Sequence, residues 1–152
     1  MHRFLAVVLL LALPGVCLGA ASGSGRVVKV LPLYLDQRGH DALSPSLFDR
    51  DAYQARLRTG SEVPSAVRFD VLWMGAAKGA KLTLRVEMRG VDAQGLPRQA
   101  MLEKEVKSNF FSRWTSLTLD GEQFKNVGSL IAWKVTLLSD NQTLNEQKSF
   151  LW

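Results

Sequence analysis

His40 is the only histidine after the first twenty residues, and it lies among residue types that occur in hydrolytic triads. The carboxylate and hydroxyl side chains close to it in sequence belong to Asp36, Asp41, Ser44 and Ser46. A nucleophilic serine is often held in a strained turn such as the G-x-S-x-G elbow, and the sequence contains no such elbow. Because residues 38–41 also have the composition of a polar surface loop, we expect an exposed histidine and no catalytic triad.

Glu103 and Glu105 are a pair of carboxylates on one face of a predicted strand, since alternate residues of a strand share a face. A glycosidase needs two carboxylates at a suitable separation. Lys104 and Lys107 lie beside this pair, which is typical of a charged strand face in contact with solvent. We therefore expect no catalytic pair of carboxylates.

Four aspartates offer the hard oxygen ligands that calcium prefers. They are Asp36, Asp41, Asp49 and Asp51. Their spacing differs from that of the calcium-binding loop with a glycine at its sixth position. The only cysteine, Cys17, lies near the N-terminus, and one histidine cannot build a zinc site of several histidines. We expect neither a metal nor an organic cofactor.

Three aromatic residues and one arginine are close together in the segment 109–114: Phe110, Phe111, Arg113 and Trp114. Trp114 is out of phase with the inward residues expected after it, Leu117 and Leu119, so its side chain should point away from the core. Exposed aromatic rings stack on sugars and also suit a protein partner. Two interpretations remain open: a ligand or partner patch, or side chains that cover the end of a sandwich or pack on a helix.

The chain ends on the apolar residues Phe150, Leu151 and Trp152. We expect them in a last strand that closes a sheet or pairs through its edge with a partner chain. Outer-membrane β-barrels also end on an aromatic residue in an alternating strand, so a small barrel is an alternative.

One helix is predicted over residues 46–58. Ser46 and Asp49 have capping-box spacing, with aspartate in place of glutamate, and Gly60 is a natural C-terminal stop. The predicted buried stripe of this helix comprises Phe48, Ala52 and Ala55.

Seven strands are predicted, most of them from the alternation of apolar and polar residues. The first is Arg26–Tyr34, in which Pro32 marks an edge strand. The others are expected near residues 67–73, 81–88, 99–107, 115–119, 131–137 and 144–152. The inward-facing side chains include Val67, Phe69, Val71, Trp73, Leu82, Leu84, Val86, Met88, Ala100, Leu102, Val106, Ile131, Trp133, Val135 and Leu137. Strands do not alternate with helices, which favours an antiparallel sandwich.

Residues 1–20 have the pattern of a signal peptide. A basic start precedes an apolar run over residues 4–13, which is too short to span the roughly 30 Å of a bilayer core. We expect cleavage near Gly19 to Ala21, followed by a flexible leader over residues 21–25. Val16 before Cys17 fits a lipoprotein signal poorly, so lipidation is not expected. The domain 26–152 is therefore expected in the periplasm or outside the cell, with only transient membrane contact through the signal peptide.

The chain has 152 residues, of which 47% are hydrophobic and 22% charged, values typical of one packed globular domain. Its net charge of +5 comes from scattered basic residues and not from a basic run, which argues against nucleic acid as a partner. Without Cys17 the domain has no thiol, so its core alone must hold it together.

The segments Val67–Trp73, Lys81–Met88 and Ile131–Trp152 resemble strands of the immunoglobulin-like or fibronectin type III-like sandwich modules that bacteria secrete. The helix at 46–58 and the lack of an inter-sheet cysteine pair depart from that pattern. The resemblance implies a mainly β, immunoglobulin-like sandwich with one inserted helix. Since catalytic constellations are missing, we expect a non-enzymatic exported binding or structural module of the cell envelope with a protein or envelope partner. A carbohydrate-binding module that uses the aromatic patch is the alternative.

Overall fold

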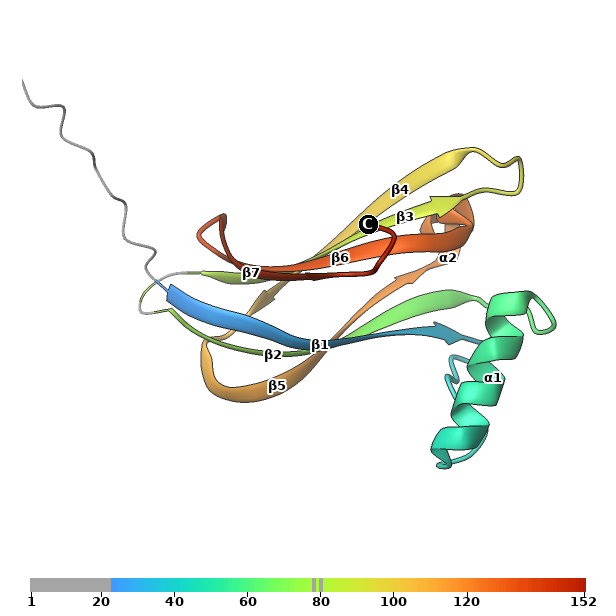
Figure 1. Cartoon of the computed structure of the whole chain (residues 1–152), viewed down its shortest axis with the longest axis horizontal. Coiled ribbons are helices and arrows are strands. Elements are labelled where there is room, and N and C mark those ends of the chain that lie inside the picture. Colours follow the sequence, from blue (N-terminus) through green and yellow to red (C-terminus); the bar gives the residue numbers. More distant parts are fainter. Residues whose placement is uncertain (1–22, 78, 80) are drawn as a thin grey trace, which may run out of the picture.

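The computed structural model describes residues 23–77, 79 and 81–152 (Figure 1). The predicted signal peptide, with Cys17 and the cleavage region, lies outside them. The strands are β1 (Gly23–Leu35), β2 (Ala66–Ala77), β3 (Leu82–Val91), β4 (Pro97–Val106), β5 (Asn109–Asp120), β6 (Ser129–Ser139) and β7 (Gln142–Lys148). The helices are α1 (Leu47–Thr59) and α2 (Gly121–Val127). Within these residues no helix is long and apolar enough to cross a membrane.

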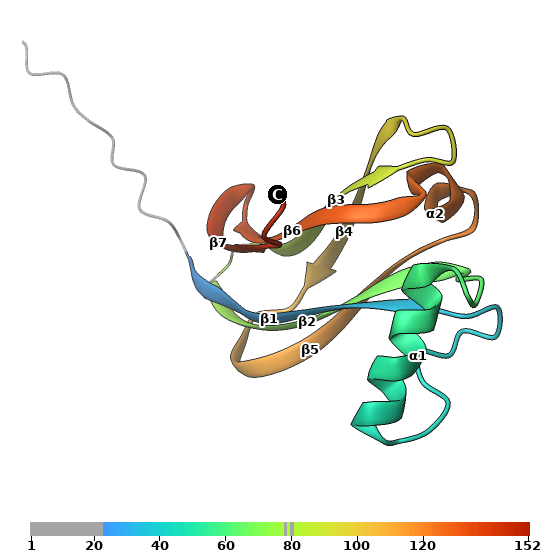
Figure 2. The ribbon, with the colours of Figure 1, turned by 45° about the vertical axis from the view of Figure 1, so that its right-hand side comes forward.

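The strands form two antiparallel sheets that pack face to face, as Figures 1 and 2 show. One sheet has the order β1-β2-β5 and the other the order β4-β3-β6-β7. The first, second and fifth strands thus lie opposite the third, sixth and seventh, as in immunoglobulin domains, with the fourth strand paired to the third. The prediction of an antiparallel, immunoglobulin-like sandwich is confirmed.

The core consists of side chains that alternate along the central strands of both sheets. Phe69, Val71 and Trp73 of β2 and Leu84 and Val86 of β3 are all 0% exposed. Trp73 donates a hydrogen bond from Nε1 to Thr115 Oγ1 at 2.8 Å, so its buried polar group is satisfied. The predicted inward faces of β2 and β3 are confirmed, because the two-residue period of a strand puts alternate side chains on one side.

The first strand begins earlier than predicted. β1 starts at Gly23, so residues 23–25, expected in the leader, pair with residues 75–77 of β2. Gly25 lies opposite Gly75, and a Cβ on Gly25 would be 2.5 Å from Leu137 Cδ2 of the opposite sheet. The two glycines therefore let Leu137 pack closely against the backbone of both strands.

Helix α1 begins and ends as predicted. Ser46 Oγ accepts a hydrogen bond from Asp49 N at 3.4 Å, and Gly60 closes the helix with φ 79°.

The predicted buried stripe of α1 is wrong. Its buried residues are Tyr53, Gln54 and Leu57, whereas Phe48 is 82% exposed. The helix crosses the end of the sandwich, and its first turn points away from both sheets (Figure 1). Phe48 lies in that first turn, so only the later turns of the helix reach the sheet.

Side-chain amides occupy the free edge of β1. Gln54 is 3% exposed; its Oε1 accepts from Tyr34 N and its Nε2 donates to Tyr34 O, both at 2.8 Å. Gln54 Nε2 also donates to Asp41 O at 2.9 Å. Farther along the edge, Asn145 Oδ1 accepts from Val27 N at 2.9 Å, and Gln147 Nε2 donates to the carbonyl of residue 28 at 3.3 Å. These amides take the place of a neighbouring strand.

The region after β5 differs from the sequence prediction. The fifth strand is longer than residues 115–119, and the short helix α2 follows it, which the alternation pattern did not predict. Helix α2 buries only Phe124 and Val127. Ile131, predicted to face inward, is 48% exposed because it lies at the open end of the sandwich, while Val135 and Leu137 are fully buried.

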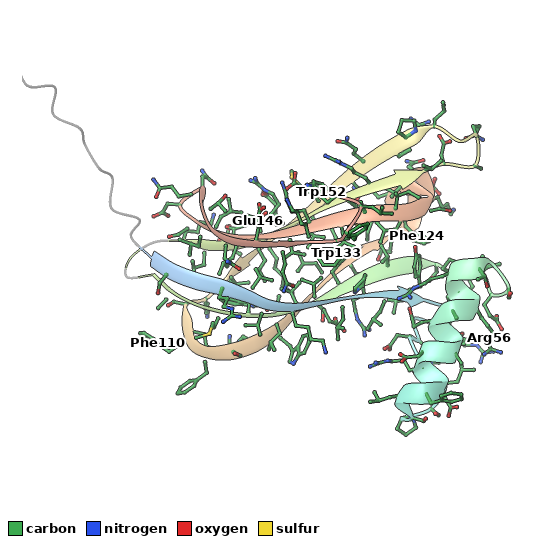
Figure 3. All side chains as sticks on the ribbon, in the orientation of Figure 1. Arg56, Phe110, Phe124, Trp133, Glu146 and Trp152 are labelled. Carbon is green, nitrogen blue, oxygen red and sulfur yellow. The ribbon has the colours of Figure 1, made fainter. Side chains whose placement is uncertain are left out.

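The last strand ends earlier than predicted. β7 stops at Lys148, so Phe150, Leu151 and Trp152 do not form an edge strand. The chain turns instead, and Trp152 N donates to Ser149 O at 3.2 Å. The Trp152 ring lies 4.0 Å from the Arg89 guanidinium carbon and 5.0 Å from Lys134 Nζ, and these cations hold it on the outer face of the sheet (Figure 3).

We predict that Gln54→Glu destabilises the domain by at least about 2 kcal/mol at pH 8. A carboxylate there would place a second oxygen against the carbonyls of Tyr34 and Asp41. Burial would raise the pKa of the introduced acid, so the protonated form would be favoured and the loss of stability would shrink as the pH falls toward 5. Urea unfolding followed by fluorescence at both pH values measures this.

The control is Gln123→Glu, which introduces the same charge at an exposed position of α2. A loss of stability equal to that of the control, or one that does not change with pH, would contradict the assigned role of Gln54.

Candidate functional site

The segment singled out in the sequence forms an exposed surface at the start of β5. We call Phe110, Phe111, Arg113 and Trp114 the aromatic–basic patch. Phe110 is 77%, Phe111 80% and Trp114 49% exposed. Figure 3 shows Phe110 at the rim of the molecule, away from the core and at the end of the sandwich opposite α1. The start of β5 is therefore far from α1, so the helix-packing part of the second interpretation does not hold.

An irregularity in the pairing of β2 with β5 explains this exposure. Trp73 is paired with Arg113 and Gly75 with Asn109. Between these two pairs β5 has residues 110–112, whereas β2 has Met74 alone. The extra residues bulge out of the sheet, so two consecutive phenylalanines can both project from the sandwich. Met74, opposite the bulge, is itself 37% exposed.

A shallow groove runs beside the patch, on the side of the sandwich where β4 and β5 are both edge strands. Its volume is about 410 Å³, and its lining includes Lys104, Lys107, Arg113, Trp114 and Ser116. Lys104 Nζ donates to Ser116 O at 3.2 Å and so links the two sheets. The bond leaves the positive charge of Lys104 on the groove, because its acceptor is a neutral carbonyl.

The cations of this region have no acidic partner in the part of the chain that the structure describes. The neighbouring carboxylates are already paired, Glu103 with Arg85 at 2.6 Å and Glu105 with Lys81. Among the residues that the structure describes, no ion pair involves Lys104, Lys107 or Arg113. The sequence has no Asp or Glu between Glu105 and Asp120. The patch therefore combines exposed rings with uncompensated positive charge.

His40 lies in an exposed loop, and its surroundings do not form a triad. Its Nδ1 is 3.7 Å from Asp36 Oδ2, and its side chain is 56% exposed. Ser44 Oγ donates to Asp49 Oδ2 at 2.6 Å, and Ser46 Oγ caps α1. Within the described part of the chain neither hydroxyl has a hydrogen bond to His40.

Asp36 organises this loop. Its carboxylate accepts hydrogen bonds from the backbone N–H groups of Arg38 and His40 and, at 2.8 Å, from the Tyr53 hydroxyl. The His40 N–H, followed by the Tyr53 hydroxyl, lowers the pKa of Asp36, and the same bond to Asp36 raises the pKa of Tyr53. The carboxylate therefore has a structural role, since it fixes the connection between β1 and α1.

The other carboxylates considered in the sequence are dispersed. Asp41 is paired with Arg68 at 3.4 Å and Asp51 with Arg50 at 3.5 Å, while Asp49 lies in the first turn of α1. In the ranges 23–77 and 81–152, no three His, Cys, Asp or Glu side chains lie close enough together to hold a metal ion.

A larger hollow, about 660 Å³, lies at the α1 end of the sandwich. Its lining includes Tyr34, Phe124, Ile131 and Trp133, with Arg58 at its side. The Tyr34 and Phe124 rings meet edge to face with centroids 6.3 Å apart, and burial raises the pKa of Tyr34. Sequence reasoning missed this hollow because it assigned Ile131 and Trp133 to a closed core, and only the splaying of the two sheets exposes them.

Comparison of the chain with protein-family models, with curated proteins and with solved structures gave no match.

We predict that Asp36→Asn makes the free energy of unfolding depend less steeply on pH in the acid range. A carboxyl whose pKa is lowered by folding stabilises the protein above its usual pKa of 3.8, and this contribution is lost as the pH falls through the lower value of the folded state. The variant should therefore lose less unfolding free energy than the wild type when the pH falls from about 5 to about 2. Urea unfolding at a series of pH values measures the difference.

Asp51→Asn is the matched control, since Asp51 is exposed and its partner is the adjacent Arg50. If both variants follow the wild-type pH profile, the assigned role of Asp36 is wrong.

Proposed function

We propose that this protein is a non-enzymatic, exported binding module of the cell envelope, and that the aromatic–basic patch is its binding surface. The observation that carries the proposal is the exposure of Phe110 and Phe111, 77% and 80%, on a bulge that the sandwich core does not require. Exposed apolar side chains that are clustered, unlike scattered ones, mark interaction sites. Arg113 and the uncompensated lysines beside it add a preference for anionic partners.

Two further observations support the proposal. The signal-peptide pattern of residues 1–20 supports export to the envelope. The side chains most suited to catalysis have structural partners, since Asp36 binds loop N–H groups and Glu103 binds Arg85. A rigid sandwich that presents an irregular, aromatic end to its surroundings suits recognition better than turnover.

We predict that Phe110→Ser/Phe111→Ser lowers binding of the purified protein to envelope fragments from a Gram-negative bacterium by at least about tenfold, because the loss of two exposed rings removes most of the apolar contact area. Co-sedimentation over a range of fragment concentrations measures the apparent affinity. Circular dichroism should show an unchanged fold, since neither ring belongs to the core.

The matched control is Phe48→Ser/Phe150→Ser, which removes two phenylalanines that are 82% and 101% exposed but lie outside the patch. Equal loss in the control and in the patch variant would show that general hydrophobicity causes binding. Absence of wild-type binding would overturn the proposed function.

A carbohydrate-binding module is a second candidate, favoured by the position of Trp114. Its ring is half exposed and lines the groove between β4 and β5, where Lys104 and Ser116 supply polar groups. A flat aromatic ring beside hydrogen-bonding side chains is the arrangement that a sugar ring requires.

For this candidate we predict that Trp114→Ala abolishes the retardation of the protein in gels that contain soluble polysaccharides, because stacking supplies most of the contact. Trp152→Ala removes a ring from the opposite sheet and should leave the retardation unchanged. Retardation that survives Trp114→Ala, or no retardation by any polysaccharide, would exclude this second function.

A further inference from the structure

We infer that the aromatic–basic patch binds the surface of a membrane rich in anionic phospholipid. The inference rests on the proposed function and names the partner of the same site. It depends on three properties of the patch and its surroundings: the apolar side chains project outward, the cations in and beside the patch form no ion pair with the described residues, and the backbone is irregular.

The apolar part projects from an end of the domain. Phe110 and Phe111 are more exposed than Trp114 and extend from the bulge, while Trp114 faces the groove behind them. Phenylalanine rings form no hydrogen bonds, so these two rings have little to offer the polar rim of a sugar or a peptide. They are suited to the boundary between headgroups and acyl chains, where membrane-surface segments bury apolar side chains such as phenylalanine.

Positive charge surrounds these rings. Lys107 and Arg113 flank the bulge, and Lys104 lies on the adjoining groove. Arg26, paired in register with Met74 of β2, adds an exposed cation on the other side. Basic residues at a membrane surface are attracted by anionic headgroups, and each contributes separately to binding.

The outer face of the other sheet differs from the patch in its ion pairs. There Arg85 is paired with Glu103, Lys134 with Glu87 at 2.7 Å, and Lys81 with Glu105. Cross-strand ion pairs thus neutralise most of that face, whereas the described residues of the patch have none. An anionic membrane would be attracted to the end of the molecule that carries the phenylalanines.

The backbone of the bulge sets the depth of contact. Residues 110–112 fall outside the register with β2, so any of their peptide groups left without a bond in the ladder needs water or headgroup oxygens. Such a segment can enter the wet headgroup region but not the hydrocarbon core. The contact is therefore shallow: two rings at the acyl boundary, with cations among the phosphates.

Co-sedimentation with vesicles tests the inference. The protein is used in its exported form, and its N-terminus is determined by mass spectrometry. The vesicles consist either of phosphatidylglycerol or of phosphatidylcholine. We expect at least about tenfold tighter binding to phosphatidylglycerol, which weakens as salt is added. Phe110→Ser/Phe111→Ser and, separately, Lys107→Gln/Arg113→Gln should each weaken that binding about tenfold or more.

Two matched controls should bind like the wild type. Phe48→Ser/Phe150→Ser removes phenylalanines elsewhere, and Arg38→Gln/Lys148→Gln removes two exposed cations outside the patch. All variants share the same N-terminal residues, so differences between them report on the patch.

The inference is overturned if phosphatidylglycerol vesicles bind no better than phosphatidylcholine vesicles, or if the controls lose as much binding as the patch variants. If envelope fragments still bind through Phe110 and Phe111 while anionic vesicles do not, the proposed function stands and the membrane is not the partner. If neither preparation binds, both are wrong.

Discussion

The free edge of β1 is the constraint on which the rest of this sandwich depends. An edge strand exposes unpaired backbone groups, and here side chains from distant parts of the chain satisfy several of them. Gln54 bonds both polar groups of Tyr34 and so attaches α1 to the sheet. Asn145 and Gln147 bond β1 next to its irregularity and so attach β7. One side of the sandwich is thereby closed without a continuous sheet.

The opposite side of the sandwich, between β4 and β5, is not closed in this way. There Lys104 Nζ donates a hydrogen bond from β4 to Ser116 O of β5, and the groove beside it remains open. The irregular start of β5 lies on this side and is not enclosed by a helix or a neighbouring strand. The patch and the amide-bonded edge thus lie on opposite sides of one sandwich: side-chain amides join β1 to α1 and β7, whereas the groove between β4 and β5 stays open.

Local patterns in the sequence were enough to predict the central strands and the limits of α1. Phe69 and Trp73 face the core because a pleated strand alternates its side chains, and Ser46 and Gly60 bound the helix through short-range geometry. The buried face of α1 depends instead on where the helix meets β1, and the carboxamide of Gln54 decides that contact. The bulge at Phe110 depends on the register between β2 and β5, which the residues of β5 alone do not contain. Their spacing predicted the patch residues and the outward direction of Trp114, but not the bulge that exposes both Phe110 and Phe111.

An exposed Phe-Phe pair on an edge strand would ordinarily promote aggregation, because a flat apolar edge can pair with another chain. Two features of β5 oppose such pairing. The bulge at residues 110–112 interrupts the regular backbone ladder where the rings project, and Lys107 and Arg113 place charge on either side of them. The rings therefore remain available while the backbone around them is a poor template for another strand.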